Sequence, residues 1–328
     1  MVLALAWPGL ALCQERQNQF NGQVGVMLAH NQASQGEVSR NHTDMLTAVG
    51  LRTQHETQMG GLVARGLVQI MIRGGGSWEP QELNVGLENE AYGVDLGRMF
   101  PGTAQVGKHY LDRNVDASPF VGEPTDSGDF LRLRARQLDL SALLGTANRS
   151  DSDEGDYTRE TLGLYWSGQP ASLIVKLALI QMRDKVDPET NPAGMGGTYD
   201  GRSDNVQALG LGKKIDQVQV SLNAERRAAS SGHAQADRWD RATDQLIFDW
   251  RITDHSGLSL ILSQQGTDKK SPRQGTDLRE DRQRTDLSWR YDHLDTWYFL
   301  MASQDGNKTE GAEASSRSQL AVVAIHNF

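Results

Sequence analysis

The sequence predicts an all-β protein, namely one transmembrane, antiparallel, up-and-down β-barrel of about sixteen strands. Apolar and polar residues alternate with a period of two through most of the 328 residues, and helical periodicity is nowhere sustained. Short and long connections between the alternating segments follow each other in strict turn. No apolar run reaches the roughly 18 residues that a membrane-spanning helix requires. The mean hydropathy of -0.54 fits a barrel, whose apolar residues occupy alternate positions only.

The first thirteen residues are apolar and are followed at once by polar sequence. Small residues at Ala11 and Cys13 resemble the cleavage site of a secretory signal, so we expect residues 1–13 to be a signal-peptide remnant and residues 14–328 to form the barrel. The alternative is a short buried segment. Cys13 is the only cysteine, which excludes a disulfide framework and cysteine-based metal sites.

Candidate strands follow one another along the chain, and each approaches the roughly ten residues that a tilted membrane strand needs. With this alternation Leu177 is expected to face lipid and its neighbour Ala178 a wet lumen. The apolar positions of the clearest segments are Val24, Val26 and Leu28; Val49 and Leu51; Leu62, Ala64, Val68, Ile70 and Ile72; Leu83, Val85 and Leu87; Leu173, Val175, Leu177 and Leu179; Leu246, Phe248, Trp250 and Ile252; Leu258, Leu260 and Leu262; Leu287, Trp289 and Tyr291.

The connections sort by length, which predicts tight turns at one end of a barrel and long loops at the other. A soluble sandwich has no reason to show this sorting. Aromatic residues lie beside the short connections, as an interfacial girdle would, although ordinary sheet packing is the alternative. Short connections are expected near residues 55–60, 89–91, 137–139, 167–170, 213–216, 253–256 and 292–295, and long ones near 31–42, 74–80, 99–129, 148–156, 182–203, 227–240, 267–282 and 305–316.

The stretch from Phe130 to Leu140 alternates most sharply. Leu131, Leu133 and Ala135 fall on one face of an extended strand, and Arg132, Arg134 and Arg136 fall on the other. The leucines would lie on a core in a soluble sheet, with the arginines in water. In a membrane barrel they would face lipid, with the arginines in an aqueous lumen.

Three stretches resemble the Gram-negative general porins. Gly50-Leu51-Arg52, followed by residues 60–64 and Gln69, looks like the second and third strands of that family. Residues 85–98, VGLENEAYGVDLGR, are similar to its VGL-x-G-x-FG-x-(small)-x-LGR signature. Residues 323–328 resemble its final strand, which ends in phenylalanine.

This resemblance implies a sixteen-stranded barrel in the bacterial outer membrane, usually a homotrimer. It also implies that the third long loop, residues 99–129, is folded into the lumen. Phe328 would be read by the assembly machinery, and the barrel would contact outer-membrane lipid and lipopolysaccharide. The implied constriction sets acids of the loop against a basic wall. The acids are Asp112, Asp116, Glu123, Asp126 and Asp129, and the basic residues are Arg132, Arg134, Arg136 and Arg98, with Arg65 a further inward candidate by parity.

Opposed charge rows across a narrow channel create a transverse field that orients polar solutes and disfavours apolar ones. The alternative is a solvated face on which the arginines pair with neighbouring acids. The sequence thus favours passive diffusion of small hydrophilic solutes and ions. A solute-selective or mainly structural barrel comes second, and an enzyme or soluble binding β-protein third.

Other motifs are weaker. Asp151, Asp153, Glu154 and Asp156 have the spacing of a calcium loop but lack the glycine and final glutamate of an EF-hand. We expect a solvated acidic loop, with a divalent bridge to lipopolysaccharide phosphates as the alternative.

The eight histidines never pair at metal-ligand spacing and no GxSxG element occurs, so neither a cofactor nor enzyme activity is expected. The net charge of -9 disfavours nucleic acid as a partner.

Overall fold

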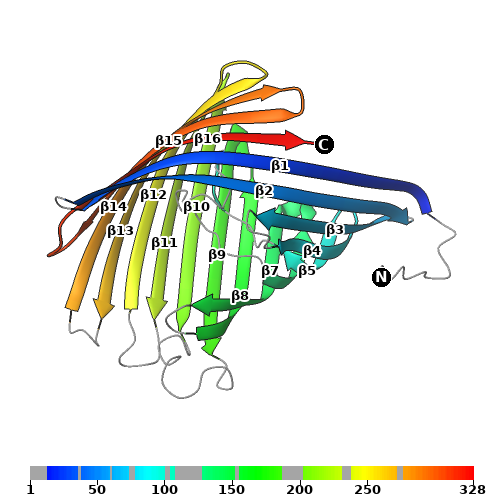
Figure 1. The fold of residues 1–328 in the computed structure, drawn as a ribbon. Helices are drawn as coiled ribbons and strands as arrows, with labels where there is room; N and C mark the ends of the chain where they lie inside the picture. Colours follow the sequence, from blue (N-terminus) through cyan, green and yellow to red (C-terminus); the bar gives the residue numbers. More distant parts are fainter. Residues whose placement is uncertain are drawn as a thin grey trace.

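The computed structural model describes residues 13–35, 38–59, 61–73, 78–99, 104–107, 128–151, 155–186, 202–230, 238–271 and 276–328. These residues form a closed barrel of sixteen antiparallel strands, each paired with its neighbours in sequence, and β1 lies beside β16 (Figure 1). The predicted fold class is therefore confirmed. The strands are β1 Cys13–Gln35, β2 Val38–Met59, β3 Leu62–Arg73, β4 Trp78–Glu88, β5 Tyr92–Met99, β6 Gly128–Ala135, β7 Leu140–Asp151, β8 Gly155–Gly168, β9 Leu173–Val186, β10 Ser203–Ile215, β11 Val218–Ser230, β12 Arg238–Arg251, β13 Ser256–Ser271, β14 Thr276–His293, β15 Thr296–Thr309 and β16 Ser315–Asn327.

Two turns contain short 3-10 helices, Arg136–Leu138 and Pro170–Ser172. Among the described residues there is no helix with the length and apolar character needed to cross a bilayer. The expected signal remnant falls on residues 1–12, which lie outside the described residues, and on Cys13, the first residue of β1.

The two faces of the barrel wall differ sharply. Residues 104–107 lie inside the barrel, where Ala104 packs against Ala178 and Ile180 of β9. We call the side of the wall that these residues contact the inner face. Leu177 is 42% exposed on the outer face, whereas its neighbour Ala178 is 0% exposed on the inner face. The alternation predicted for this strand is confirmed, but Ala178 does not face a wet lumen, because residues 104–107 cover it.

Several connections that the sequence marks as long are mostly strand. Between β1 and β2 only residues 36–37 intervene, although residues 31–42 were expected to be a loop. Between β13 and β14 only residues 272–275 intervene, in place of the expected 267–282. The physical reason is that these strands continue beyond the apolar part of the wall with polar residues on both faces, so the period-two signal fades while the hydrogen-bond ladder continues. The short turn at 89–91 lies where it was predicted.

The C-terminus completes the closure of the barrel. The backbone N–H of Gly22 donates to the Phe328 carbonyl at 2.8 Å, and the N–H of Phe328 donates to the Gly22 carbonyl at 2.9 Å. The Phe328 ring lies over Gly22, where a Cβ would collide with it. Phe328 is exposed on the same outer face as Leu320 and Val322. The last residue thus joins the final strand to the first.

Deleting Phe328 should weaken this closure. Loss of two backbone hydrogen bonds, each worth about 0.5–1.5 kcal/mol, should lower the free energy of unfolding by roughly 1–3 kcal/mol. The measurement is the fraction of protein that keeps its compact, heat-modifiable migration on a gel across a denaturant series. Phe328→Leu is the matched control, since it keeps both backbone bonds and should lose less. Equal stability of the deletion variant and the full chain would contradict the assigned closure.

Candidate functional site

A cluster of ion pairs lies on the inner face of β3 to β6. Arg65 comes from β3 and Arg134 from β6, and between them stand Glu88 of β4 and Asp95 of β5. Arg132, also on the inner face, is paired with Asp95 in the β5–β6 register. The strong alternation of β6 therefore places two of its three predicted arginines together on the inner wall.

The two carboxylates bridge the two guanidiniums. Asp95 Oδ1 lies 2.8 Å from Nη2 of Arg65, and Asp95 Oδ2 lies 3.2 Å from Nε of Arg134. Glu88 Oε2 lies 2.8 Å from Nη2 of Arg134 and 3.3 Å from Nη2 of Arg65. Charge-assisted bonds of this kind hold planar guanidiniums in a fixed orientation. The arrangement positions basic groups along the wall while part of each guanidinium remains accessible.

Arg136 is not the third member of a strand row. β6 ends at Ala135, and Arg136 begins the 3-10 helix of the next turn. Its Nη1 reaches back to Glu88 Oε1 at 3.1 Å and to the carbonyl of Asn89 at 3.2 Å. Arg136 therefore extends the cluster to the end of the barrel that carries the short turns, called here the short-turn end.

Two glycines make room for these side chains. A Cβ on Gly93 would come within 3.0 Å of the Arg134 guanidinium, and a Cβ on Gly86 would collide with Asp95 Oδ1. Both glycines lie on the inner face, opposite Arg134 and Asp95 in the strand register. They let charged groups lie flat against the wall instead of projecting into the lumen.

Arg98 and Asp129 do not belong to this cluster, which corrects the expectation from the motif. They form a separate pair on the outer face, with Arg98 Nε 4.0 Å from Asp129 Oδ1. The reason is parity, because Asp95 and Arg98 are three residues apart on one strand and point to opposite faces. Asp129 belongs to β6, and its side chain is 71% exposed.

The third long connection enters the barrel, as predicted. β5 and β6 have only 8 residues each, so the chain leaves the wall early between them. Its described part, residues 104–107, lies against the inner faces of β9 to β12. The predicted acids Asp112, Asp116, Glu123 and Asp126 lie outside the described residues.

A set of inner-face residues holds this segment, called here the loop anchor: Lys176, Gly210, Gly212 and Asn223. The Asn223 side chain accepts from the N–H of Val106 at 2.7 Å and donates to the carbonyl of Val106 at 3.0 Å. Lys176 Nζ donates to the carbonyl of Gln105 at 3.0 Å. A Cβ on Gly210 would collide with the carbonyl oxygen of Ala104, and one on Gly212 with the Val106 side chain. The backbone of the loop therefore sits directly on the wall.

A second charged group lies near the long-loop end of β8 to β11. Arg159 Nε and Nη2 bind both oxygens of Asp184 at 2.7 and 2.8 Å. Arg227 Nη2 binds Asp204 Oδ2 at 2.7 Å, and all four residues are buried on the inner face. The sequence reading did not single out these residues or the loop anchor. Inward parity next to a strand end would have found the charged pairs, but nothing local marks the anchor.

The weak metal candidate gains no support. Asp153 lies outside the described residues, and Asp151 and Asp156 are placed only by their backbone, at the ends of β7 and β8. Within the described part of the chain no three His, Cys, Asp or Glu residues are arranged to hold a metal ion.

The loop anchor can be tested by chemical accessibility. Gln105 is 4% exposed, so a Gln105→Cys variant in a Cys13→Ser background should react slowly with a maleimide. Adding Gly210→Ala forces the Ala104 carbonyl away from the wall and should speed labelling by about tenfold, which corresponds to roughly 1.4 kcal/mol of local opening. Gly266→Ala is the control, because its Cβ would meet nothing nearer than 3.5 Å. Equal labelling rates in the two glycine variants would show that Gly210 does not hold the loop.

No protein-family model matches the chain, and no curated protein sequence matches it. Solved structures of outer-membrane proteins match it. The outer membrane channel DcaP of Acinetobacter baumannii is 11% identical, with a TM-score of 0.69 over 95% of this chain and 97% of its own. The anion-selective porin from Comamonas acidovorans is 16% identical, with a TM-score of 0.66 over 96% and 100%. OmpT, an outer membrane protein of Vibrio cholerae in its trimer form, is 14% identical, with a TM-score of 0.64 over 95% and 99%.

Identities this low show the fold alone. The likenesses cover almost the whole of this chain and of each matched chain, so the whole barrel is shared, not one part of it. The resemblance drawn from the sequence is thereby confirmed as a likeness of architecture: the chain has the fold of a porin-type outer-membrane barrel.

Proposed function

We propose that the chain forms an outer-membrane channel through which small hydrophilic solutes and ions diffuse passively. The observation that carries the proposal is the opposite chemistry of the two faces of a closed wall. Leu96 and Leu133 are exposed on the outer face, and Asp95 and Arg134 lie one residue away on the inner face. Such a wall suits lipid outside and water inside.

The inner cluster supports a channel that discriminates by charge. A barrel of sixteen strands is too wide for wall side chains to fill, so its lumen is aqueous unless a loop narrows it. Residues 104–107 stand on the β9–β12 side of the wall, and β7 and β8 separate these strands from the cluster on β3 to β6. A solute between the two would pass guanidiniums that are held in place but partly accessible.

The cluster presents charges of both signs to the lumen. The guanidiniums of Arg65, Arg132, Arg134 and Arg136 lie beside Glu88 and Asp95, and the inner face of the neighbouring strands adds Glu56, opposite Arg65, and Glu82. In a confined channel such charges are screened less than on an open surface, where the Debye length is about 8–10 Å. This stretch of wall should therefore act strongly on the ions that pass it.

The remaining parts of the proposal follow the porin resemblance. The outer face would contact outer-membrane lipid and lipopolysaccharide, the chain would assemble as a homotrimer, and Phe328 would be recognised by the assembly machinery. The loop acids Asp112, Asp116, Glu123 and Asp126 would face the basic wall.

Ion selectivity tests the channel directly. Changing Arg65, Arg132 and Arg134 to Gln should shift the reversal potential of reconstituted channels toward cations across a potassium chloride gradient, because Glu88 and Asp95 remain. The opposite change, Glu88→Gln with Asp95→Asn, should shift it toward anions. Both shifts should shrink at high salt.

Arg98→Gln is the matched control, since it removes one positive charge from the outer face. It should leave the reversal potential unchanged. If the inner-face variants conduct but show no shift at low salt, the cluster lies outside the ion path. If the wild-type barrel gives no conductance at all, the proposed channel is wrong and a mainly structural barrel takes its place.

The location of the wall in a membrane gives a further prediction. Leu177→Arg should destabilise the barrel by about 2–4 kcal/mol if Leu177 faces the middle of the bilayer. Gln181→Arg, four residues along the same outer face, should be nearly neutral because Gln181 is already polar and exposed. The measurement is the urea midpoint in lipid vesicles. Equal midpoints for the two variants would argue against hydrocarbon around Leu177.

A further inference from the structure

The apolar part of the outer wall is short along four neighbouring strands. Each of β13 to β16 carries only three outward apolar side chains in succession, partly or fully exposed. They are Leu258, Leu260 and Leu262; Leu287, Trp289 and Tyr291; Tyr298, Leu300 and Ala302; and Leu320, Val322 and Ala324.

Polar residues bound these three tiers at both ends. The next outward positions toward the long loops are Gln264, Thr285, Gln304 and Ser318. The next outward positions toward the short turns are Ser256, His293, Thr296 and His326. The strands themselves continue well beyond the polar boundary on the long-loop side, since β13 runs to Ser271 and β14 begins at Thr276.

The far side of the barrel repeats the pattern. Strands β5 to β8 also carry three outward apolar residues each, ending at Leu96, Leu131, Leu144 and Leu162. The next outward positions toward the long loops are Arg98, Asp129, Thr146 and Glu160. Other strands differ in the length of the row. The outward row of β3 runs over six positions from Leu62 to Ile72, β9 and β11 carry four outward apolar residues each, and β10 carries two in succession, Leu209 and Leu211.

The height of this belt follows from strand geometry. Three outward residues take up six residues of strand, which at about 3.3 Å per residue is roughly 20 Å along the strand. With a tilt of about 40° the belt is roughly 15 Å tall along the membrane normal, against about 25 Å for a typical outer-membrane barrel. On the three-tier strands the shortfall is about two tiers.

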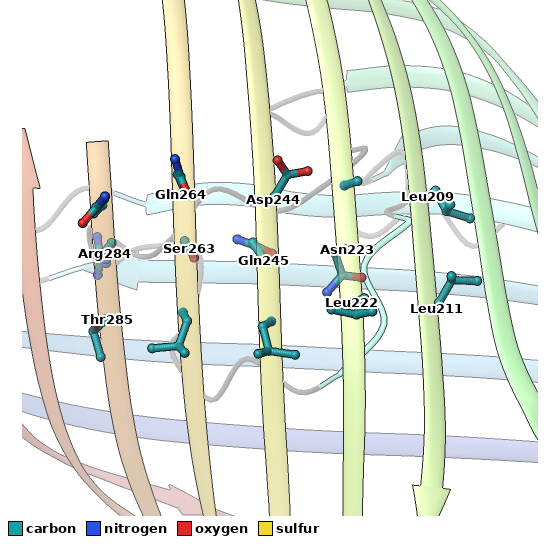
Figure 2. A pocket seen from close by; sticks show the side chains of 14 residues that line it. Leu209, Leu211, Leu222, Asn223, Asp244, Gln245, Ser263, Gln264, Arg284 and Thr285 are labelled. Atoms are coloured by element: carbon teal, nitrogen blue, oxygen red, sulfur yellow. The ribbon is translucent and has the colours of Figure 1, made fainter. Parts of the chain in front are cut away.

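A thicker bilayer would bury charged groups at the polar boundary on the long-loop side of the belt. Asp244 of β12 and Arg226 of β11 lie on the outer face at this level and pair at 3.1 Å, with both side chains more than half exposed. A hollow in the outer wall straddles the boundary, and Figure 2 shows Asp244 and Gln264 on the long-loop side of Leu211 and Leu222. Burying such groups in hydrocarbon destabilises a barrel.

We infer that the outer face is built for a thin hydrocarbon layer, one of short acyl chains or one that the barrel compresses around itself. The inference rests on the membrane location in the proposed function but not on conduction. A bilayer thicker than the belt either covers the polar boundary or thins locally, and both are unfavourable. Lipid chains of matching length are the occupant that the three tiers fit.

Equilibrium stability in two lipids tests this inference. The full chain is folded into dilauroyl- and dioleoylphosphatidylcholine vesicles, and the urea midpoint of heat-modifiable migration is approached from the folded and unfolded sides. We expect the midpoint to be higher in the short-chain lipid. A variant with Gln264→Leu, Thr285→Leu and Gln304→Leu adds a fourth tier on three adjacent strands, and its midpoint should shift toward the long-chain lipid.

The matched control places the same three leucines four residues further toward the long loops on the same strands and face, as Asp268→Leu, Asp281→Leu and Lys308→Leu. These positions lie beyond the boundary and should not change the lipid preference. A wild-type preference for the long-chain lipid overturns the inference, as does an equal shift in the variant and its control. If the chain folds in neither kind of vesicle, the proposed membrane location is overturned as well. A preference that disappears in the assembled oligomer shows that other copies, not lipid, cover the boundary, and also overturns it.

Discussion

The closed hydrogen-bond ladder is the constraint on which the rest of the structure depends. In hydrocarbon an unpaired backbone group is so unfavourable that a sheet can cross only if it has no edge. Here every strand pairs on both sides, and Gly22 and Phe328 complete the ring. The ladder shows no register shift from β4 through β16 to β1 in the described residues. One contact with the interior, that of Ala104 with Ala178, therefore fixes which way every side chain along that run points.

Much of the fold could be predicted because a paired strand between two different surroundings requires alternating residues, and this alternation is visible in each short stretch of sequence. Leu177 on the outer face, the turn at 89–91 and the count of strands all follow from alternation and connection length. Arg134 and Arg65 were predicted on the inner wall for the same reason. Arg98 was placed there by its position in a motif, and counting from Asp95 puts it on the opposite face. Parity was the better guide.

What the sequence could not show involves contacts between distant parts of the chain. Ala178 has the parity of a residue facing water, but a loop that starts some seventy positions earlier lies on it. From the sequence alone, Gly210 and Gly212 look like positions that weaken a strand. In the structure Ala104 and Val106 occupy the space that side chains there would take. The polar ends of β13 and β14 were taken for loops because, where both faces are wet, no alternation is needed to keep a strand paired.

Asn223 holds the loop by its backbone. Its side-chain amide binds only the N–H and carbonyl of Val106, groups that every residue except proline possesses. Lys176 likewise binds a carbonyl. These hydrogen bonds therefore recognise the course of the backbone, while the side chains of Ala104 and Val106 pack against the wall. Residues of the loop beyond the anchor can be exchanged for others of different charge or size without loss of this attachment, so in the proposed channel selectivity can diverge while the scaffold stays the same.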